Sequence, residues 1–105
     1  MNTFEIYIAF VSWESSGKHR PVLILEVNAN SATVFSITTH YDNKSERIRT
    51  RYFVIDEWRQ AGLNKQSYID TNNTITLPIS AVDSKRPIGR LSERDEILLI
   101  KFVSQ

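Results

Sequence analysis

A nearly unbroken apolar run close to the N-terminus limits the folds that this chain can adopt. Residues 22–25 are Val-Leu-Ile-Leu, and a charged segment that ends in Arg20 and Pro21 precedes them. Such a run is typical of a strand that is covered on both faces of its sheet. Proline has no N–H to donate to a neighbouring strand, so we expect Pro21 at the start of this strand. Arg20 would then lie at the rim of the sheet.

Several other segments also have the residue types of strands. β-Branched and aromatic residues are frequent in them, and short polar turns separate them, a pattern that favours a sheet. Strands are expected over residues 3–12, 20–27, 33–41 and 46–55, with a polar loop at 13–19 and a hairpin with an Asn-Asn turn over 66–80. Within residues 46–55 the side chains alternate, which predicts one strand face that carries Arg47, Arg49 and Arg51.

Two segments predict helices. Residues 56–63 have Asp56 at the position of an N-cap and Gly62 at that of a C-terminal stop, which fits one or two helical turns. Ser92 and Asp95 have the spacing of a capping box, so a helix is expected over residues 91–103. Apolar residues almost encircle that helix, and a final strand is the alternative. These elements predict a β-rich α+β fold, which is a strongly bent antiparallel sheet or small barrel with one internal and one C-terminal helix.

The composition excludes several kinds of site. A chain of 105 residues is expected to build one domain, residues 1–105. There is no cysteine, which excludes disulfides, thiolate metal sites and a cysteine nucleophile. His19 and His40 lie too far apart in sequence for a metal pair, so we expect chemistry without a metal or another cofactor. No apolar run reaches the roughly 20 residues that cross a bilayer, and the N-terminus lacks a basic leader. A cytoplasmic protein is therefore expected.

Charge is balanced overall but uneven along the chain. The formal net charge is +1, yet residues 44–51 hold four basic side chains and one acidic one. A basic strip in a nearly neutral protein can contact the phosphates of a nucleic acid. The alternative is a solvated edge strand whose charges discourage aggregation.

Three stretches occur in an order that carries a family resemblance. They are GKHRPVLIL at residues 17–25, FSITTHY at residues 35–41, and the segment 61–95, which contains AGL, a hairpin, IG and LS. Together they span most of the chain, and in this order the sequence resembles the MazF/PemK family of toxins from type II toxin–antitoxin systems. Phe4 and Glu5 stand where the family usually opens with Gly-Asp.

The resemblance implies a fold, an activity and partners. The fold would be an SH3-like barrel with a C-terminal helix, usually in a homodimer. The activity would be that of an mRNA interferase, a metal-independent hydrolase that cleaves single-stranded RNA at specific sequences through attack of the 2′-hydroxyl on the adjacent phosphate. A cognate antitoxin would hold the toxin inactive. Two alternatives stay open: a non-catalytic barrel that binds nucleic acid or peptide, and a toxin-like fold that acts on a topoisomerase.

Arg20 and Thr38 are the first candidate catalytic residues. A guanidinium group holds phosphate oxygens in pairs and keeps its charge, so Arg20 suits the scissile phosphate; its alternative role is an ordinary rim arginine beside a proline. The resemblance assigns Thr38 as a hydroxyl donor to the same phosphate. Thr39 is its possible substitute, but only one of these two neighbours can face the cleft of Arg20.

The general base stays open between His40 and Glu14. His40 shares the strand face of Thr38 and could accept a proton near neutral pH, although a solvated histidine at a strand end is the alternative. Glu14 could serve if the loop at residues 13–19 folds inward. The same loop would gate access to Arg20.

RNA contacts are expected from this loop, from the end of the third strand and from the basic strip. Aromatic rings can stack on bases, and cations can follow the phosphate backbone. The candidate RNA-binding residues are Trp13, Lys18, His19, Thr39, Arg47, Arg49 and Arg51. For Trp13, burial as an anchor of the fold is an equal alternative.

Overall fold

Six strands in the described part of the chain form one antiparallel sheet. The structure, a computed structural model, describes residues 1–13, 16–83 and 86–105, and gives only the backbone of Trp13. The strands are β1 (Glu5–Trp13), β2 (Ser16–Val27), β3 (Ser31–Thr38), β4 (Tyr52–Val54), β5 (Tyr68–Pro78) and β6 (Gly89–Arg90). Their order across the sheet is β4-β5-β3-β2-β1-β6. The helical elements are α1 (Glu46–Arg49), the short 3₁₀ helix η1 (Ile79–Ala81) and α2 (Glu93–Val103).

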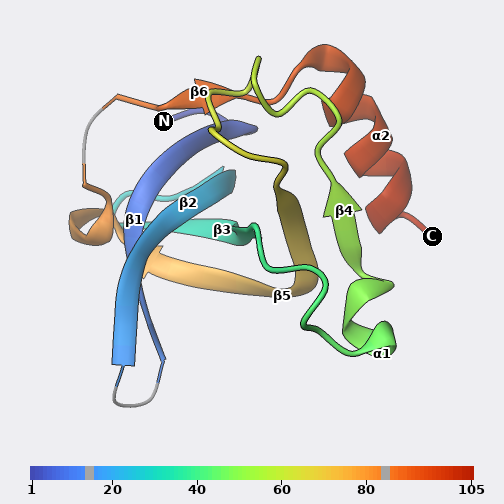
Figure 1. The fold of residues 1–105 in the computed structure, drawn as a ribbon. Coiled ribbons are helices and arrows are strands. Elements are labelled where there is room, and N and C mark those ends of the chain that lie inside the picture. The colour runs from blue at the N-terminus through green and yellow to red at the C-terminus, as the bar shows by residue number, and fades with distance from the viewer. Residues whose placement is uncertain (14–15, 84–85) are drawn as a thin grey trace.

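The sheet curls into a half-barrel, and α2 packs beside β4 at one side of it (Figure 1). This arrangement confirms the predicted β-rich α+β fold with a small bent sheet, a short internal helix and a C-terminal helix. None of the helices in the described parts is long and apolar enough to cross a membrane.

The apolar run of β2 supplies both faces of the sheet with core residues. Leu23 joins the cluster that packs under α2, with Phe35, Ile69 and Leu99. Its neighbours Val22 and Ile24 turn to the opposite face and join Tyr7 and Val34 there. A fully buried Val, Leu or Ile contributes roughly 1.5–3 kcal/mol. The prediction of a strand covered on both faces is therefore confirmed.

Pro21 lies in the middle of β2, not at its start. The hairpin of β1 and β2 continues as far as Trp13 and Ser16, so most of the predicted polar loop is strand, and Pro21 pairs with Ile8. The carbonyl of Ile8 accepts from the N–H of Asp83 at 2.9 Å, away from β2. In an antiparallel pair the nitrogen of Pro21 then faces away from β1, toward the side of β3. The ladder between β2 and β3 ends at the pair Val22–Ser36 and does not reach Pro21. The observed ladder therefore has no bond for the proline to break.

Two predicted β segments fold differently. Residues 46–49 form α1, because the Ser45 hydroxyl caps this turn by accepting from the N–H of Ile48; β4 covers only Tyr52–Val54. The prediction that Arg47, Arg49 and Arg51 share a strand face is therefore wrong. Residues 66–80 form no hairpin: β5 runs through the two asparagines as one strand, with a register shift opposite β3.

Of the two helix predictions, the one for residues 91–103 is confirmed, whereas residues 56–63 contain a turn and no helix. Ser92 caps α2 by accepting from the N–H of Asp95 at 3.1 Å, so the alternative of a final strand is wrong. Residues 56–62 form a single helix-like turn that ends at Gly62, with φ +88°. Bonds from Gly62 N–H to the Arg59 carbonyl and from Leu63 N–H to the Trp58 carbonyl close a Schellman motif there.

The N-cap of this turn comes from a distant residue. The carboxylate of the fully buried Asp95 accepts from the backbone N–H groups of Asp56 and Glu57, at 3.4 and 2.9 Å. Asp56 instead forms an ion pair with Arg94 at 3.2 Å. The predicted N-cap role of Asp56 is wrong, since a side chain of α2 takes that place.

Candidate active site

A cleft opens where β2 and β3 separate. Because Val22 pairs with Ser36, the same register places Arg20 opposite Thr38, although the ladder has already ended there. Two adjoining pockets lie at this point, of about 190 and 280 Å³. Four residues line both of them: Lys18, Arg20, Thr38 and His40. The fold thus brings together Arg20, Thr38 and His40, three of the predicted catalytic residues.

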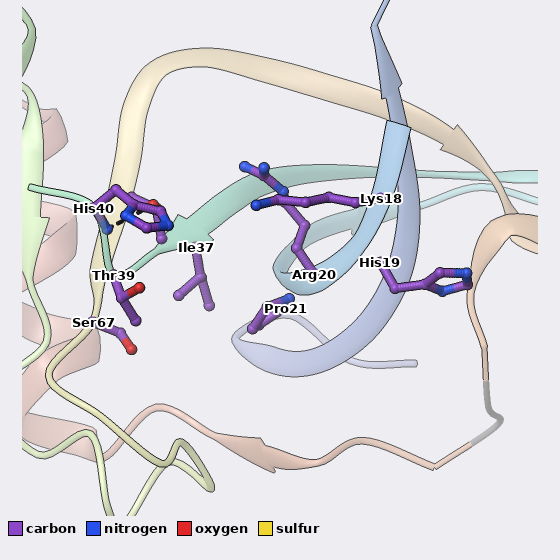
Figure 2. A pocket seen from close by; sticks show the side chains of 9 residues that line it. Lys18, His19, Arg20, Pro21, Ile37, Thr39, His40 and Ser67 are labelled. Carbon is purple, nitrogen blue, oxygen red and sulfur yellow. Dashed lines mark hydrogen bonds between the residues drawn. The ribbon is translucent and has the colours of Figure 1, made fainter. Parts of the chain in front are cut away.

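Arg20 is oriented by a neighbour on β3. Its Nη1 donates to the Ser36 hydroxyl at 3.1 Å, and the side chain is half-buried. Figure 2 shows Lys18 and Arg20 extending from β2 toward β3, whereas the His19 ring points the other way. Two cations of β2 therefore converge on the cleft from alternate positions of one strand, as the side-chain alternation of a strand requires.

Thr38 and His40 are joined by a local bond at the end of β3. The backbone N–H of His40 donates to the Thr38 hydroxyl oxygen at 3.0 Å. This bond uses the oxygen as an acceptor and leaves the hydroxyl proton free to donate to a ligand. Because β3 ends at Thr38, the place of His40 beside the cleft follows from this turn rather than from strand alternation.

Two further residues of the cleft, Asp70 and Tyr52, were not predicted from the sequence. Asp70 pairs with Ser36 across β3 and β5, and with Tyr52 across β4 and β5. Directly paired residues share a face of the sheet, so a line of polar side chains runs from Arg20 through Ser36 to Tyr52. Asp70 Oδ1 accepts from the N–H and the side-chain amide of Asn72, at 2.9 and 2.8 Å. Both Asp70 and Tyr52 line the larger pocket.

The electrostatics of the cleft keep Tyr52 protonated. Burial raises the pKa of the Tyr52 phenol above its usual value of 10.0, and the negative charge of Asp70 raises it further. The positive charge of Arg20 acts in the opposite direction on the same pKa. At neutral pH Tyr52 is therefore a hydroxyl donor. To place Tyr52 in the cleft from the sequence, one would have to know how β5 pairs with both β3 and β4. The register shift between β3 and β5 hides that pairing.

The remaining predicted residues lie outside the centre of the cleft. Thr39 lines the smaller pocket together with Arg20 but not the larger one, whereas Thr38 lines both. The His19 ring bonds Asp83 Oδ2 at 2.7 Å and lies edge-on to Phe10. Glu14 and the side chain of Trp13 fall outside the described residues. The basic residues Arg47, Arg49 and Arg51 line neither pocket.

Metal ligation was not expected from the sequence. In residues 1–13, 16–83 and 86–105, no group of three or more histidine, aspartate or glutamate side chains is placed to hold a metal ion. The donor set of the cleft consists of cations, hydroxyls, one histidine and one carboxylate. Such a set suits an anionic ligand such as a phosphate.

Comparison with solved structures assigns the fold to a known type. The structure of the Mycobacterium tuberculosis toxin MazF-mt6 matches this chain with a TM-score of 0.71 and 28% sequence identity, and the match covers 95% of this chain and 92% of that chain. The chain is MazF-like. No family model and no curated protein sequence matches it. The MazF-like fold extends over nearly the whole of both chains, so the resemblance seen in the sequence is confirmed.

Proposed function

We propose that this MazF-like chain is the toxin of a toxin–antitoxin pair and cleaves single-stranded RNA without a metal. The observation that carries the proposal is the convergence of Arg20, Lys18 and Thr38 on one cleft, in a chain whose fold matches that of a toxin. Two cations and a hydroxyl donor at the end of two diverging strands form a site for a phosphodiester.

The reaction would use the RNA's own 2′-hydroxyl as the nucleophile. Its oxygen attacks the adjacent phosphorus, the bond to the 5′-oxygen breaks, and the products are a 2′,3′-cyclic phosphate and a 5′-hydroxyl. Negative charge builds up on the phosphoryl oxygens during the attack. The Arg20 guanidinium, held by Ser36, and the Thr38 hydroxyl would stabilise that charge. A single well-placed donor of this kind is worth about 2.7–4 kcal/mol.

Two protons must move during the reaction. We assign His40 as the base that removes the proton of the 2′-hydroxyl, because histidine exchanges a proton near neutral pH. Tyr52, which keeps its proton in the cleft, would supply one to the departing 5′-oxygen. Asp70 is the alternative base, since it lines the same pocket as Arg20 and His40.

The decisive experiment is RNA cleavage in the presence of EDTA. The refolded protein, free of any antitoxin, should cut single-stranded RNA and leave cyclic phosphate and 5′-hydroxyl ends. Arg20→Ala should lower the rate by about 10²–10³-fold with an unchanged circular dichroism spectrum. Arg94→Ala, on α2 and away from the cleft, is the matched control and should cleave normally. Intact RNA after incubation with the unmodified protein would refute the proposal, and binding without cleavage would favour a non-catalytic nucleic-acid-binding module.

We further propose that two copies of the chain associate through α2. Ile97, Ile100 and Val103 are spaced by three residues along this helix and are 48%, 51% and 44% exposed. An apolar stripe of this kind on a helix surface marks a protein interface. Ile100→Asp should convert a dimer to a monomer in sedimentation experiments. Val27→Asp, at a position of β2 that is 41% exposed, should leave the dimer intact.

The antitoxin would bind the cationic cleft. Lys18, Arg20 and Lys44 line the larger pocket, so an acidic segment that covers it would exclude RNA by competing for the same charges. A small acidic protein encoded beside this chain should therefore co-purify with it and inhibit cleavage. Failure of the Arg20→Ala variant to weaken that complex would indicate binding at another surface.

A further inference from the structure

A tight turn follows β3 and faces the cleft. The N–H of Lys44 donates to the carbonyl of Tyr41 at 3.2 Å, which closes a turn over residues 41–44. Two side chains of this turn, Asn43 and Lys44, line the larger pocket together with Arg20. The turn therefore adds a third cation to a pocket that already holds Lys18 and Arg20. Asp70 is the one carboxylate among the described residues that line it.

The Tyr41 ring anchors the turn to three other elements. It stacks on Tyr68 of β5, with ring centroids 4.5 Å apart and planes at 20°. It also lies 6.2 Å from the ring of Tyr52 of β4, and the guanidinium carbon of Arg49 of α1 sits 5.4 Å from its centroid. Stacked rings and a cation over a ring face are both attractive. These three contacts fix the place of the Tyr41 ring beside the cleft.

We infer that Tyr41 is a positioning residue, which holds the 41–44 turn so that Lys44 contacts an RNA phosphate next to the one at Arg20. The inference rests on the RNA binding proposed above. Tyr41 is half-buried among its three partners and lines neither pocket, so its ring is not a platform for a base. Lys44 is itself half-buried, and a side chain with fewer accessible conformations loses less freedom when a phosphate binds.

The inference predicts a specific dependence on salt. Each phosphate contact with a single strand contributes about 0.7 to the slope of log Kd against log salt, because a contact releases counterions. If the turn loses its anchor, Lys44 no longer makes its contact, and the slope should fall by about 0.7. At about 0.1 M salt this loss corresponds to roughly fivefold weaker binding.

The experiment measures the binding of a fluorescent 2′-O-methyl oligonucleotide, which lacks the attacking hydroxyl and cannot be cleaved. The affinity is measured across a range of salt concentrations for the unmodified protein and for Tyr41→Ala, Tyr41→Phe and Lys44→Gln. Tyr41→Phe keeps the stacked ring and should match the unmodified protein. Tyr41→Ala and Lys44→Gln should each lower the slope by about 0.7, and the double variant should lose no more than either one. Lys101→Gln, on the exposed side of α2, is the control and should not change the slope.

Two results would overturn the inference alone. If Tyr41→Ala weakens binding without changing the slope, the ring contacts RNA directly and does not act through Lys44. If the losses of the two single variants add in the double variant, the residues act independently. Tyr41→Leu replaces Tyr41→Ala if the latter fails to fold, as judged by its melting curve. An unmodified protein that does not bind the oligonucleotide at all would overturn the proposed RNA binding together with this inference.

Discussion

Replacing Asp95 by alanine tests the link between α2 and the turn at residues 56–62. The Asp95 carboxylate is fully buried and accepts from the N–H groups of Glu57 and Asp56 at 2.9 and 3.4 Å. Alanine removes both acceptors and leaves the two N–H groups at the start of the turn without partners. The N–H of residue 95 still donates to the Ser92 hydroxyl, so α2 keeps its own cap.

The size of the effect follows from these two bonds. A hydrogen bond to a charged group is worth about 1.5–3 kcal/mol, and a donor left without a partner inside the protein costs about 1–3 kcal/mol. The 3.4 Å bond to Asp56 is long and adds little. We therefore expect Asp95→Ala to lower the free energy of unfolding by about 3 kcal/mol. For a domain of this size, that corresponds to a fall in melting temperature of roughly 12–24 °C.

Urea unfolding followed by tryptophan fluorescence measures the change, because Trp58 lies in the affected turn. Asp56→Ala is the matched control. Asp56 makes an exposed ion pair with Arg94, and a pair of this kind contributes about 0–1 kcal/mol. If Asp56→Ala proved more destabilising than Asp95→Ala, Asp56 would be the true N-cap, as its sequence position suggests, and the role given to Asp95 would be refuted.

Three other changes test the backbone, the pH dependence and the proposed chemistry. Gly62→Ala should cost at least about 2 kcal/mol in urea unfolding, since Gly62 has φ +88° and an added Cβ would lie 2.1 Å from the Ile88 carbonyl oxygen; a neutral result would show that the turn can move away from β6. The pKa of Tyr52 is raised in the folded state, so its contribution to stability is present below the unfolded value of 10.0 and is lost as pH rises through the folded value. Between about pH 9 and about pH 12, the free energy of unfolding should therefore fall less in Tyr52→Phe than in the unmodified protein. An equal fall would contradict the raised pKa of Tyr52. His40→Gln should slow RNA cleavage by about 10²-fold or more, whereas an unchanged rate in this variant would assign the base to Asp70.

Local signals in the sequence were sufficient for several elements. The apolar run at residues 22–25 predicted a strand with two covered faces, and Ser92 and Gly62 marked the start of one helix and the end of one turn. Each of these predictions rests on a local signal, namely a helix cap, a positive φ or a side-chain period. Such signals involve only residues within a few positions of one another. Arg20 and Thr38 were assigned together through the family resemblance, and they lie on two consecutive strands, β2 and β3.

The errors arose where distant residues decide the outcome. The turn at residues 56–62 takes its cap from Asp95, far along the chain. The alternation of residues 46–55 predicted a strand, but the Ser45 cap favours a helical turn. In β5 the register with β3 shifts between Val34 and Ser36, and no periodicity within one strand reveals such a shift. Asp70 and Tyr52 enter the cleft through that shifted pairing, so they could not be assigned from the sequence.

Pro21 has no amide proton to offer β3 at the point where the cleft opens. Any other residue at this position would present an N–H toward β3. The β2–β3 ladder could then gain one more hydrogen bond, which would draw Arg20 and Thr38 together. With proline no such bond can form, and the β2–β3 ladder ends at Val22 and Ser36. Under the proposed function, a polynucleotide would enter here without first separating two hydrogen-bonded strands, because the proline itself sets the opening.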